Sequence, residues 1–463
     1  MRCRVESLDL SAPRHLHIIG VGGPGMSALA IALAEMGNHV SGVDVRESPA
    51  LDAVRNAGVK VFLSHRRENL DGPIDAVIRS TAIALNHPEV EWARQSDIPV
   101  IDRGPVLAGM AKKVTTISVT GTHGKTTTSA MLAAILRVAG RNPSYVIGGI
   151  VDELGGNAHW GSGDVFVMES DESDASGFAC TPFGVIVTNV EPDHLEFHGS
   201  LQNLESAYLR FVEKATGPRL FCADDEFLAA NLSHATDSYG FGNKASVQLR
   251  QFTPSVDGTS FELWRDDQQL AAISLSMPGR HNALNATAAF LMATSLGVSR
   301  AEAENALAQF GGVQRRFQKV AEVNDIVIVD DFAHLCREIQ VTIQAAQLGN
   351  YTRILTVFQP HRYSRTESLH AEFASAFVGS DLLVLTDVYA AGEEPRPGVD
   401  GRLILNDVKA AHPEQEVLYH ADRSTLAEVV SELIQPGDIC LTIGAGDISA
   451  LGQEIADILA ARA

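Results

Sequence analysis

The chain has 463 residues, which at about 150 residues per domain predicts two to four domains. Its 36 Lys and Arg residues against 57 Asp and Glu residues give a formal net charge of −21, which opposes general binding to nucleic acid or anionic membranes. No apolar run approaches the roughly 18–20 residues of a membrane span. The cysteines are scattered, without a CxxC pair, and suit a reducing compartment; they are Cys3, Cys180, Cys222, Cys336 and Cys440. We therefore expect a soluble cytoplasmic protein that binds no nucleic acid and inserts into no membrane.

The N-terminal elements alternate between strand and helix. Residues His15–Gly20 form a short apolar run that ends in glycine, which is typical of a buried strand. The Ala- and Leu-rich segment Met26–Met36 predicts a helix, and His39–Val45 predicts the next strand. This order predicts a parallel sheet with helices on its faces.

Two further cycles of the same kind follow. The second begins with a strand at Val114–Thr120 and a helix at Lys125–Val138, and alternation of polar and apolar residues over Ser246–Ser276 predicts an antiparallel addition. The other strands predicted for the second cycle are Val165–Glu169, Gly184–Val190 and Arg219–Cys222. The strands predicted for the third cycle are Ile326–Asp330, Arg353–Phe358, Asp381–Asp387 and Ile439–Ile443.

We therefore expect an α/β protein of three domains in series. The first, residues 1–112, is predicted to be Rossmann-like. The second, 113–316, is predicted to be a P-loop ATPase-type domain with the small antiparallel addition, and the third, 317–463, to be Rossmann-like again. The polar pair Lys112–Lys113 and the segment Arg316–Lys319 mark the two boundaries.

The first glycine loop, Gly20–Gly25, reads G-x-G-x-x-G between a predicted strand and a predicted helix. Small residues let the backbone approach a diphosphate, and the helix N-terminus attracts the charge of that group. Asp44 ends the next strand, where an acid of a dinucleotide-binding domain would hold a ribose hydroxyl. The pattern favours a diphosphate site. By itself it leaves open an NAD-dependent dehydrogenase or a purely structural turn.

The second glycine loop, Gly121–Thr128, has the sequence GTHGKTTT and also joins a strand to a helix. Backbone N–H groups of such a loop cradle phosphates, Lys125 neutralises the β and γ oxygens, and the Thr126 hydroxyl ligates Mg²⁺. The eight-residue Walker pattern is incomplete, because Val119 stands where its first glycine would be. A dehydrogenase has no use for this loop, whereas an ATP-driven enzyme acting on a nucleotide-bearing substrate would use both loops. A P-loop switch or motor is the remaining alternative.

Acidic and histidine side chains follow two strands of the same sheet. The acidic run Glu169–Asp174 closes one strand, and His194 follows the next within the segment NVEPDH. Carboxylates at the carboxyl end of a strand are placed to hold Mg²⁺ near phosphates, and a neutral histidine there can be a ligand. The alternatives are a solvated acidic loop and a surface histidine.

The third cycle carries a cationic loop in an acidic protein. Arg362 and Arg365 lie three positions apart after a strand, and offer forked donors for a carboxylate or a phosphate. Asp330 and Asp331 end another strand there and could bind a ribose or a metal. No G-x-S-x-G elbow or activated-cysteine signature is present, so covalent catalysis through a side chain is not indicated.

Together these motifs resemble those of the Mur ligases over nearly the whole chain, from His15 to about Asp447. The segments that carry the resemblance follow one another in order: GVGGPGMS (Gly20–Ser27), GTHGKTTT (Gly121–Thr128), ESDESDAS (Glu169–Ser176), NVEPDH (Asn189–His194), PGRHNALNA (Pro278–Ala286), GGVQRRF (Gly311–Phe317), FQPHRYSRT (Phe358–Thr366), YAAGEEP (Tyr389–Pro395) and GAGDI (Gly444–Ile448). The resemblance implies that ATP phosphorylates the lactyl carboxylate of UDP-N-acetylmuramate, and that an amine then attacks the acyl phosphate to form an amide. It implies ATP and Mg²⁺ as cofactors, a role in the synthesis of peptidoglycan precursors, and three domains that bind the UDP-sugar, ATP and the amino acid. We expect a monomer or a homodimer.

The resemblance also assigns residues to each ligand. The UDP-sugar would contact Gly20, Gly22, Gly23, Gly25, Met26, Ser27, Asp44, Ser80 and Arg103. ATP would contact Gly121, Thr122, His123, Gly124, Lys125, Thr126, Thr127, His281, Asn282, Asn285, Arg316, Asp330 and Asp331. Mg²⁺ would bind Thr126, Glu169 and His194, and the amino acid would contact His334, His361, Arg362 and Arg365. The residues implied to act in catalysis are Lys125, His194, Arg316, His334 and His361.

Two comparisons indicate the branch of the family that adds L-alanine. Several Mur ligases carry a carbamylated lysine where an ungapped match places Tyr208, and the loss of that lysine resembles the L-alanine-adding branch. The segment FQPHRYSRT is absent from the pattern of the recycling ligase, which attaches a whole peptide to UDP-N-acetylmuramate. That recycling ligase remains the alternative function.

One segment departs from the family pattern. The family typically reads DDYAHHPTE where Asp330–Glu338 reads DDFAHLCRE. The first histidine is kept as His334, but a tyrosine hydroxyl, a second histidine and a proline are absent. The loss of proline frees the start of the next helix, and Arg337 adds a charge. We expect activity to be retained with altered affinity or specificity for the amino acid.

Overall fold

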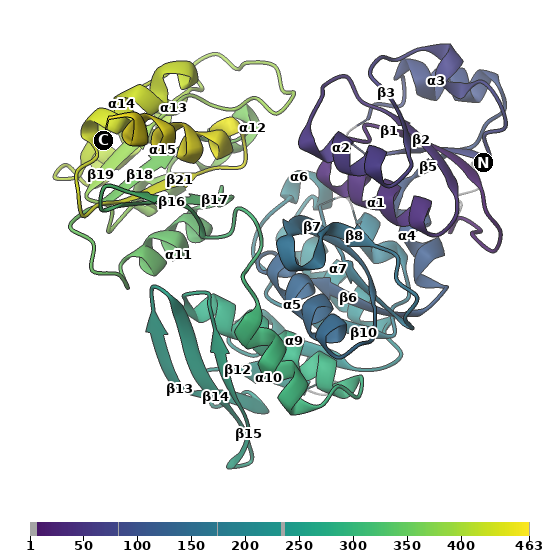
Figure 1. Cartoon of the computed structure of the whole chain (residues 1–463), viewed down its shortest axis with the longest axis horizontal. Coiled ribbons are helices and arrows are strands. Elements are labelled where there is room, and N and C mark those ends of the chain that lie inside the picture. Colours follow the sequence, from purple (N-terminus) through teal and green to yellow (C-terminus); the bar gives the residue numbers. More distant parts are fainter. Residues whose placement is uncertain (1–6, 82, 174, 233–236, 463) are drawn as a thin grey trace. The chain divides into compact units, whose positions relative to one another are not determined.

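The computed structural model describes residues 7–81, 83–173, 175–232 and 237–462 (Figure 1). Cys3 and Asp174, both named above, lie outside the described residues. The chain forms two compact units. The first runs to Gly311 without 253–259 and 276–279, and the second comprises those two short segments together with 312–463.

The N-terminal sheet is five-stranded and parallel, in the order β3-β2-β1-β4-β5. Its strands are β1 (His15–Ile19), β2 (His39–Val43), β3 (Lys60–Phe62), β4 (Ala76–Arg79) and β5 (Val100–Asp102). Its helices are α1 (Pro24–Glu35), α2 (Pro49–Asn56), the short 3₁₀ helix η1 (Arg67–Leu70), α3 (Pro88–Gln95) and α4 (Arg103–Ala111). The strand order reverses between β1 and β4, and in such sheets ligands bind at this switch point, beyond the carboxyl ends of the strands. The first glycine loop follows β1 at that place.

The central sheet has ten strands in the order β15-β14-β13-β12-β11-β10-β6-β9-β7-β8. Its strands are β6 (Thr115–Thr120), β7 (Ser144–Val151), β8 (Gly156–His159), β9 (Val165–Glu169), β10 (Gly184–Val187), β11 (Arg219–Cys222), β12 (Asp237–Gly240), β13 (Val247–Ser255), β14 (Gly258–Arg265) and β15 (Gln268–Leu275). The helices of this domain are α5 (Lys125–Val138), η2 (Asp152–Leu154), η3 (Ser176–Ala179), α6 (Leu195–His198), α7 (Leu201–Glu213), α8 (Glu226–Asn231), α9 (Arg280–Ser295) and α10 (Arg300–Gln309). Strands β13 to β15 are joined by two-residue turns, which only antiparallel neighbours allow.

The C-terminal sheet has six strands in the order β16-β17-β21-β18-β19-β20, and only the edge strand β16 runs antiparallel to its neighbour. Its strands are β16 (Gln318–Val323), β17 (Ile326–Asp331), β18 (Ile354–Phe358), β19 (Leu382–Leu385), β20 (Glu416–Tyr419) and β21 (Ile439–Ile443). Its helices are α11 (Cys336–Ala346), α12 (Tyr363–Leu369), η4 (Glu372–Ser375), α13 (Gly401–Ala411), η5 (Arg423–Thr425), α14 (Leu426–Leu433), η6 (Asp447–Ala450) and α15 (Leu451–Ala461).

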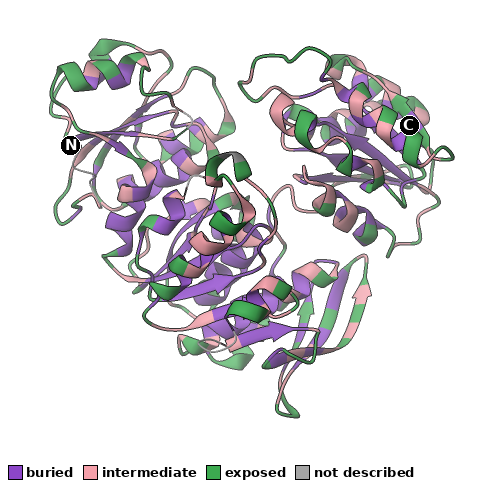
Figure 2. Ribbon diagram, turned by 180° about the vertical axis from the view of Figure 1, so that it is seen from behind, coloured by how far each residue is buried: buried purple, intermediate pink, exposed green. Residues whose placement is uncertain are grey.

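A continuous apolar core joins the first two domains. Helix α1 packs against β7 and β8, and Ala28 and Leu29 of α1 belong to the same buried cluster as Val146 and Ala158. Helix α4 also lies close to η3. Figure 2 shows the parallel strands largely buried in each domain, exposed residues on the outer faces of the helices, and antiparallel strands β13 to β15 that are partly exposed. The N-terminal and central domains therefore form one compact unit because they share a core.

The predicted fold class is confirmed, since the structure has three α/β domains with mostly parallel sheets. The predicted strands and helices are present, with ends that differ by up to three residues; β10, for example, ends at Val187 and not at Val190. Eight of the strands that the structure describes were not predicted individually: β3, β4, β5, β7, β8, β12, β16 and β20. The edge strand β16 is only partly buried and shows no clear alternation. The boundaries at 112/113 and 316/317 stay predictions.

Two further expectations can be compared with the structure. In the described part of the chain, no helix is both long enough and apolar enough to cross a membrane. The four cysteines described by the structure are all free thiols, and three of them are buried.

Candidate active site

The second glycine loop makes a tight turn between β6 and α5. Gly121 and Gly124 have φ angles of 131° and 81°, which side-chain-bearing residues rarely adopt. A Cβ at Gly121 would collide with the Thr188 hydroxyl, and a Cβ at Gly124 would lie 2.5 Å from Oδ1 of Asn285. Glycine is therefore required at both positions. The loop ends at the N-terminus of α5, whose N–H groups form a site for anions.

The segment after β10 fixes the shape of this loop. The N–H of Thr122 donates to the Asn189 carbonyl oxygen at 3.0 Å, and the N–H of His123 donates to Oδ1 of Asn189 at 2.8 Å. The N–H of Glu191 donates to Oγ1 of Thr122 at 2.9 Å. The shape of the loop is thus held by the protein itself.

The ammonium group of Lys125 is bound by a buried carboxylate. Its Nζ donates to both oxygens of Glu172, at 3.0 and 2.9 Å. The Glu172 side chain is 1 % exposed and the Lys125 side chain 13 %. Burial by itself would lower the pKa of Lys125, but attraction to Glu172 and Asp171 holds that pKa above its ordinary value. Lys125 is therefore charged, and a phosphate oxygen could take the place of Glu172 as its partner.

Two of the three predicted magnesium ligands lie together beside the loop. Oγ1 of Thr126 donates to Oε1 of Glu169 at 3.0 Å, and the N–H of Gly148 donates to Oε2 of Glu169 at 2.5 Å. Burial raises the pKa of Glu169 above its ordinary value, although the Lys125 charge opposes that shift.

The third predicted ligand, His194, lies with two other acids. One ligand atom from each of Asp171, Glu172 and His194 falls within 4.8 Å of the others. His194 has φ of 53° and its Nε2 lies 3.2 Å from Oδ2 of Asp193. Carboxylate and hydroxyl oxygens are the ligands that Mg²⁺ prefers, usually with several waters retained. The oxygens of Thr126, Glu169, Asp171 and Glu172 therefore fit a magnesium ion, whereas His194 offers a nitrogen.

Three of the residues predicted for ATP, His281, Asn282 and Asn285, lie on α9, which packs along α5. Asn282 and Asn285 are buried, and Asn285 reaches Gly124 of the phosphate loop. His281 and Asn285 are four residues apart and so lie on the same side of the helix. The structure thus brings Asn285 to the predicted nucleotide site. Thr127 is buried in the first turn of α5.

The first glycine loop is braced by Asp44. One carboxylate oxygen of Asp44 accepts the N–H of Gly22 at 2.9 Å, and the other accepts the N–H of Val45 at 2.8 Å. In this structure the carboxylate thus holds the loop, in addition to lying where a ribose-binding acid would be expected.

Arg103 lies against the start of α1. A Cβ at Gly25 would collide with Nη1 of Arg103, and Nη2 of Arg103 donates to Oγ of Ser176 at 2.7 Å. Oγ of Ser27 donates to the Pro24 carbonyl oxygen at 3.0 Å, and Met26 is buried. Ser80 directly follows β4, on the other side of the switch point. The candidates for the UDP-sugar therefore surround one carboxyl edge of the N-terminal sheet, with Gly20 and Gly23 in the loop itself.

In the second unit, the two acids that end β17 bind the turn at 315–317. Nε of Arg315 lies 2.9 Å from Oδ2 of Asp330. The carboxylate of Asp331 accepts the N–H groups of Phe317 at 2.7 Å and Ala333 at 2.8 Å. Burial raises the pKa of Asp331 to about 6. The guanidinium groups of Arg315 and Arg316 lie 5.0 and 5.3 Å from the centre of the Phe332 ring.

Three of the four predicted amino-acid contacts lie close together in this unit. The rings of His334 and His361 are 6.1 Å apart, and Nη1 of Arg365 lies 3.4 Å from Nδ1 of His361. The His361 ring stacks on Tyr389 at 5.7 Å. Burial lowers the pKa of His334, and burial together with nearby positive charge lowers the pKa of His361 to about 3. The fourth residue, Arg362, has φ of 71° and donates its N–H to the Tyr389 carbonyl oxygen.

Three residues that contact the predicted site residues had not been assigned to a ligand from the sequence. Glu172 lies in the acidic run that the sequence singled out, Arg315 precedes Arg316, and Tyr389 begins the segment YAAGEEP. Each is near a recognised motif, but its partner comes from a distant part of the chain. Only the fold reveals those pairs.

Tyr208 occupies a buried place close to the phosphate loop. Its ring packs at 5.4 Å against Phe178, and its hydroxyl is buried without a hydrogen-bond partner. Burial, followed by the charge of Glu172, raises the pKa of Tyr208 well above its ordinary value. Tyr208, a neutral phenol, therefore occupies the position at which the ungapped match places the charged carbamylated lysine of several Mur ligases.

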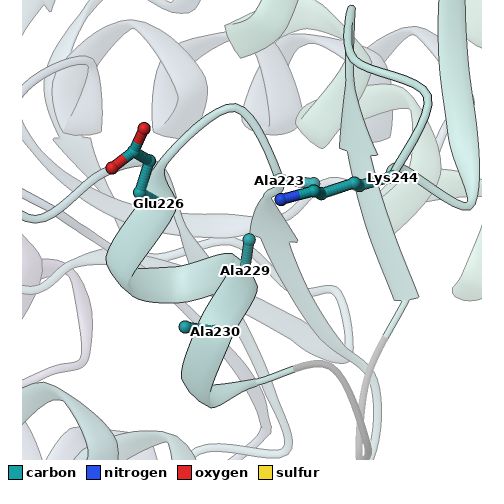
Figure 3. A pocket seen from close by; sticks show the side chains of 5 residues that line it. All are labelled: Ala223, Glu226, Ala229, Ala230 and Lys244. Atoms are coloured by element: carbon teal, nitrogen blue, oxygen red, sulfur yellow. The ribbon is translucent and has the colours of Figure 1, made fainter.

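A hollow elsewhere in the central domain contains none of the candidate residues. It has a volume of about 390 Å³ and is lined by Ala223, Glu226, Ala229, Ala230 and Lys244. Figure 3 shows Glu226 on helix α8 and Lys244 reaching in from the opposite side, with Ala229 between them. Its shallow, alanine-rich lining offers few groups that could orient a ligand.

Three domains of one family match successive parts of the chain. Residues 15–115 match the catalytic domain of the Mur ligase family, 119–293 match the Mur ligase middle domain, and 315–446 match the Mur ligase glutamate ligase domain. A protein of Desulforamulus reducens named UDP-N-acetylmuramate–L-alanine ligase is 40 % identical over 449 residues, which are 96 % of this chain and 97 % of that protein. A protein of Syntrophotalea carbinolica with the same name is 39 % identical over 97 % of this chain and 99 % of its own length.

Solved structures agree with these relatives. The crystal structure of UDP-N-acetylmuramate–alanine ligase MurC from Thermotoga maritima has a TM-score of 0.85 and 30 % identity, and the match covers 97 % of this chain and 100 % of that chain. A murein peptide ligase from Psychrobacter arcticus has a TM-score of 0.70 at 23 % identity over 96 % of this chain and 98 % of its own, which is a likeness of fold.

The low pKa of His361 predicts that this imidazole stays neutral in the folded protein well below the pH at which an exposed histidine takes up a proton. Its pKa is about 3, against an ordinary value of 6.5. Between these values the unfolded chain binds a proton that the folded chain does not, so the stability contributed by His361 is present above about pH 6.5 and lost as pH falls towards 3. NMR of the imidazole C–H groups should give one signal that is absent in His361→Asn and does not move between pH 8 and 5. A midpoint near 6.5 for that signal would contradict the prediction.

Proposed function

Because the chain belongs to the Mur ligase family, we propose that it joins L-alanine to the lactyl carboxylate of UDP-N-acetylmuramate, with conversion of ATP to ADP and phosphate. The observation that carries the proposal is the 40 % identity, over nearly the full length of both chains, to a protein named for this reaction. The phosphate loop, with its paired lysine and neighbouring acids, supports the use of ATP.

The first chemical step is transfer of the γ-phosphoryl group to the carboxylate. A carboxylate oxygen forms the new P–O bond, the bond between the γ-phosphorus and the β–γ bridging oxygen breaks, and ADP leaves. Lys125 would exchange Glu172 for phosphate oxygens, and the N–H groups at the start of α5 would bind others. Arg316 is our candidate for a contact to the γ-phosphate. When bound, Mg²⁺ would be held by residues among Thr126, Glu169, Asp171, Glu172 and His194, and would offset phosphate charge.

The second step is attack of the amino group on the acyl phosphate. The nitrogen forms the amide bond and gives up a proton, the acyl C–O bond breaks, and phosphate leaves with its electron pair and can take up that proton. Arg362 and Arg365 supply donors suited to the carboxylate of the amino acid. Burial keeps His334 and His361 neutral. Nδ1 of His334 donates to the Phe332 carbonyl oxygen, so its Nε2 can accept a hydrogen bond from the amino group of the amino acid. Nδ1 of His361 accepts from Arg365, so its Nε2–H is a donor that suits the carboxylate. These roles position the amino acid and raise its effective concentration.

The remaining assignments are also part of the proposal. The first glycine loop and Arg103 would hold the UDP diphosphate and its sugar, as the close approach of Arg103 to Gly25 supports. We place the reaction in the cytoplasm and expect a monomer or a homodimer.

The test is phosphate release from Mg-ATP with UDP-N-acetylmuramate, for single amino acids and for a tripeptide, with the product identified by mass. We expect release that requires L-alanine and a product that carries one added alanyl residue. Lys125→Ala should lower the rate by about 10²-fold or more, because a group that stabilises transferring phosphate is removed. Lys244→Ala, which removes an exposed lysine of the same domain, is the matched control and should retain the wild-type rate.

The other outcomes of this test separate the alternatives. Release only with the tripeptide would assign the recycling reaction. ATP turnover that needs neither the nucleotide sugar nor an amino acid would point to a switch or motor. Loss of activity in both lysine variants would mean that the phosphate loop has no specific role.

The departure at 332–337 predicts a change in the amino-acid step alone. Phe332 lies 5.5 Å from the His334 ring, and Cys336 begins α11 directly beyond it. Replacing Phe332, Leu335, Cys336 and Arg337 by Tyr, His, Pro and Thr should change the KM for L-alanine by about threefold or more, since one hydrogen bond contributes roughly 0.5–1.5 kcal/mol.

In the same variant, the KM values for ATP and UDP-N-acetylmuramate should stay as in the wild type. Arg337→Thr alone serves as the control, because Arg337 is exposed at the helix start. An unchanged KM for L-alanine, glycine and serine in the fourfold variant would show that the segment does not tune the amino-acid site.

A further inference from the structure

A second cluster of histidines and a carboxylate lies in the N-terminal domain, on elements that carry none of the residues assigned above. His65 lies between β3 and η1, His87 caps the N-terminus of α3, and Glu89 lies in the first turn of α3. One ligand atom from each of these three residues lies within 4.8 Å of the others. The rings of His65 and His87 pack edge to face, with centres 4.4 Å apart.

Two ligand atoms of this cluster, on His65 and Glu89, are buried without a hydrogen bond, whereas Nδ1 of His87 accepts the backbone N–H of Glu89 at 3.3 Å. Glu89 is fully buried. Its Oε1 accepts a hydrogen bond from Asn69 at 2.9 Å, but its Oε2 has no hydrogen-bond partner. Nδ1 of His65 is also buried without one, 3.5 Å from Oε1. Buried polar atoms left unbonded each cost roughly 1–3 kcal/mol, so native structures usually give them a partner.

A fourth residue lies behind the cluster. Nε2 of His17, on β1, is buried without a hydrogen-bond partner and lies 3.5 Å from Oε2 of Glu89. Its other ring nitrogen, Nδ1, is 2.9 Å from Oγ of Ser41 on β2, so the ring is held in place by the sheet. The unbonded atoms of three elements therefore face one another around Glu89.

The surroundings of the cluster shift the pKa values of two of its members. Burial by itself would raise the pKa of Glu89, but attraction to the nearby His17 and the hydrogen bond from Asn69 bring that pKa below its ordinary value. Burial lowers the pKa of His87, and a positive charge on His65 would lower it further. Because a metal ion binds an ionised carboxylate and neutral imidazoles, a bound ion would favour those forms of the three side chains.

We propose that His65, His87 and Glu89 bind a divalent first-row transition metal ion, with Zn²⁺ as the ion whose ligand preference fits best. Two imidazole nitrogens and one carboxylate oxygen are a known zinc ligand set, whereas Mg²⁺ and Ca²⁺ prefer oxygen alone. Zinc–ligand distances are about 2.0–2.2 Å, so small side-chain rotations would draw the three ligand atoms around one ion.

The partial exposure of His65 gives the ion a route from solvent to the cluster and leaves one coordination position open to water. The His65 side chain is 29 % exposed, whereas Glu89 is fully buried. An ion could therefore reach the carboxylate past His65 and keep one water ligand. Binding would tie the loop after β3 to the start of α3, and so stabilise the N-terminal domain against unfolding.

The test is a Zn²⁺ titration of the chelator-treated full-length protein, by competition with a chromogenic chelator and in the absence of nucleotide. We expect one ion per chain in the N-terminal cluster, with a dissociation constant below about 10 µM. His65→Ala and His87→Ala should each weaken it by about 10-fold or more. Co²⁺ in place of Zn²⁺ should give visible absorption bands that disappear in the same variants.

Two controls separate this site from other histidines. His39→Ala removes an exposed histidine of the same sheet outside the cluster, and should bind Zn²⁺ as the wild type does. His194→Ala removes a member of the Asp171, Glu172 and His194 cluster, so Zn²⁺ binding in the N-terminal cluster should survive it. Circular dichroism checks that each variant is folded. Because the His65 side chain is partly exposed, His65→Ala is the variant less expected to disturb folding.

The proposal is overturned by any of three results. One is a dissociation constant above about 10 µM for every ion bound by the wild type. The second is binding that persists unchanged in folded His65→Ala and His87→Ala. The third is binding that His194→Ala abolishes, which would place the ion in the central domain. None of these results depends on whether the ligase reaction is observed.

Discussion

The buried ion pair between Lys125 and Glu172 is the interaction on which the central domain depends. Taking a lysine and a glutamate out of water is expensive, and leaving either unpaired costs roughly 3–5 kcal/mol. The pair exists because β6 and β9 are adjacent parallel strands, so that the loops following them meet at one edge of the sheet. Gly121 and Gly124 then allow the chain to turn tightly enough to present the lysine there. The arrangement holds a cation ready for phosphate, with the protein supplying the counter-charge until a ligand does.

The same rule of parallel sheets explains the other candidate residues, each within its own domain. The first glycine loop follows β1, and Asp44, which braces it, follows the neighbouring strand β2. In the C-terminal sheet, His361 follows β18 and Tyr389 follows the adjacent β19, where their rings stack. Residues far apart in the sequence thus come together because the carboxyl ends of neighbouring parallel strands share an edge.

Much of the fold could be predicted from the sequence, because short apolar runs followed by glycine or acidic residues mark buried parallel strands. The two glycine loops could be recognised for the same reason, since positive φ leaves little choice of residue. The partners of the polar side chains could not be predicted. Three bonds depend on how strands distant in the sequence align: Glu172 with Lys125, Arg315 with Asp330, and Asp44 with the first glycine loop. The cluster of His65, His87 and Glu89 could not be predicted either. Its residues come from a loop, a helix cap and a helix, and they share no local sequence pattern.

The most direct measurement of the central claim is the affinity for ATP without magnesium, in a double-mutant cycle of Lys125→Ala and Glu172→Gln. If Glu172 holds Lys125 until phosphate replaces it, Glu172→Gln should tighten ATP binding by about tenfold, and this gain should vanish when Lys125 is already alanine. A gain of equal size in both backgrounds would show only general repulsion between Glu172 and phosphate. That result, or no gain in either background, would contradict the exchange of partners at Lys125.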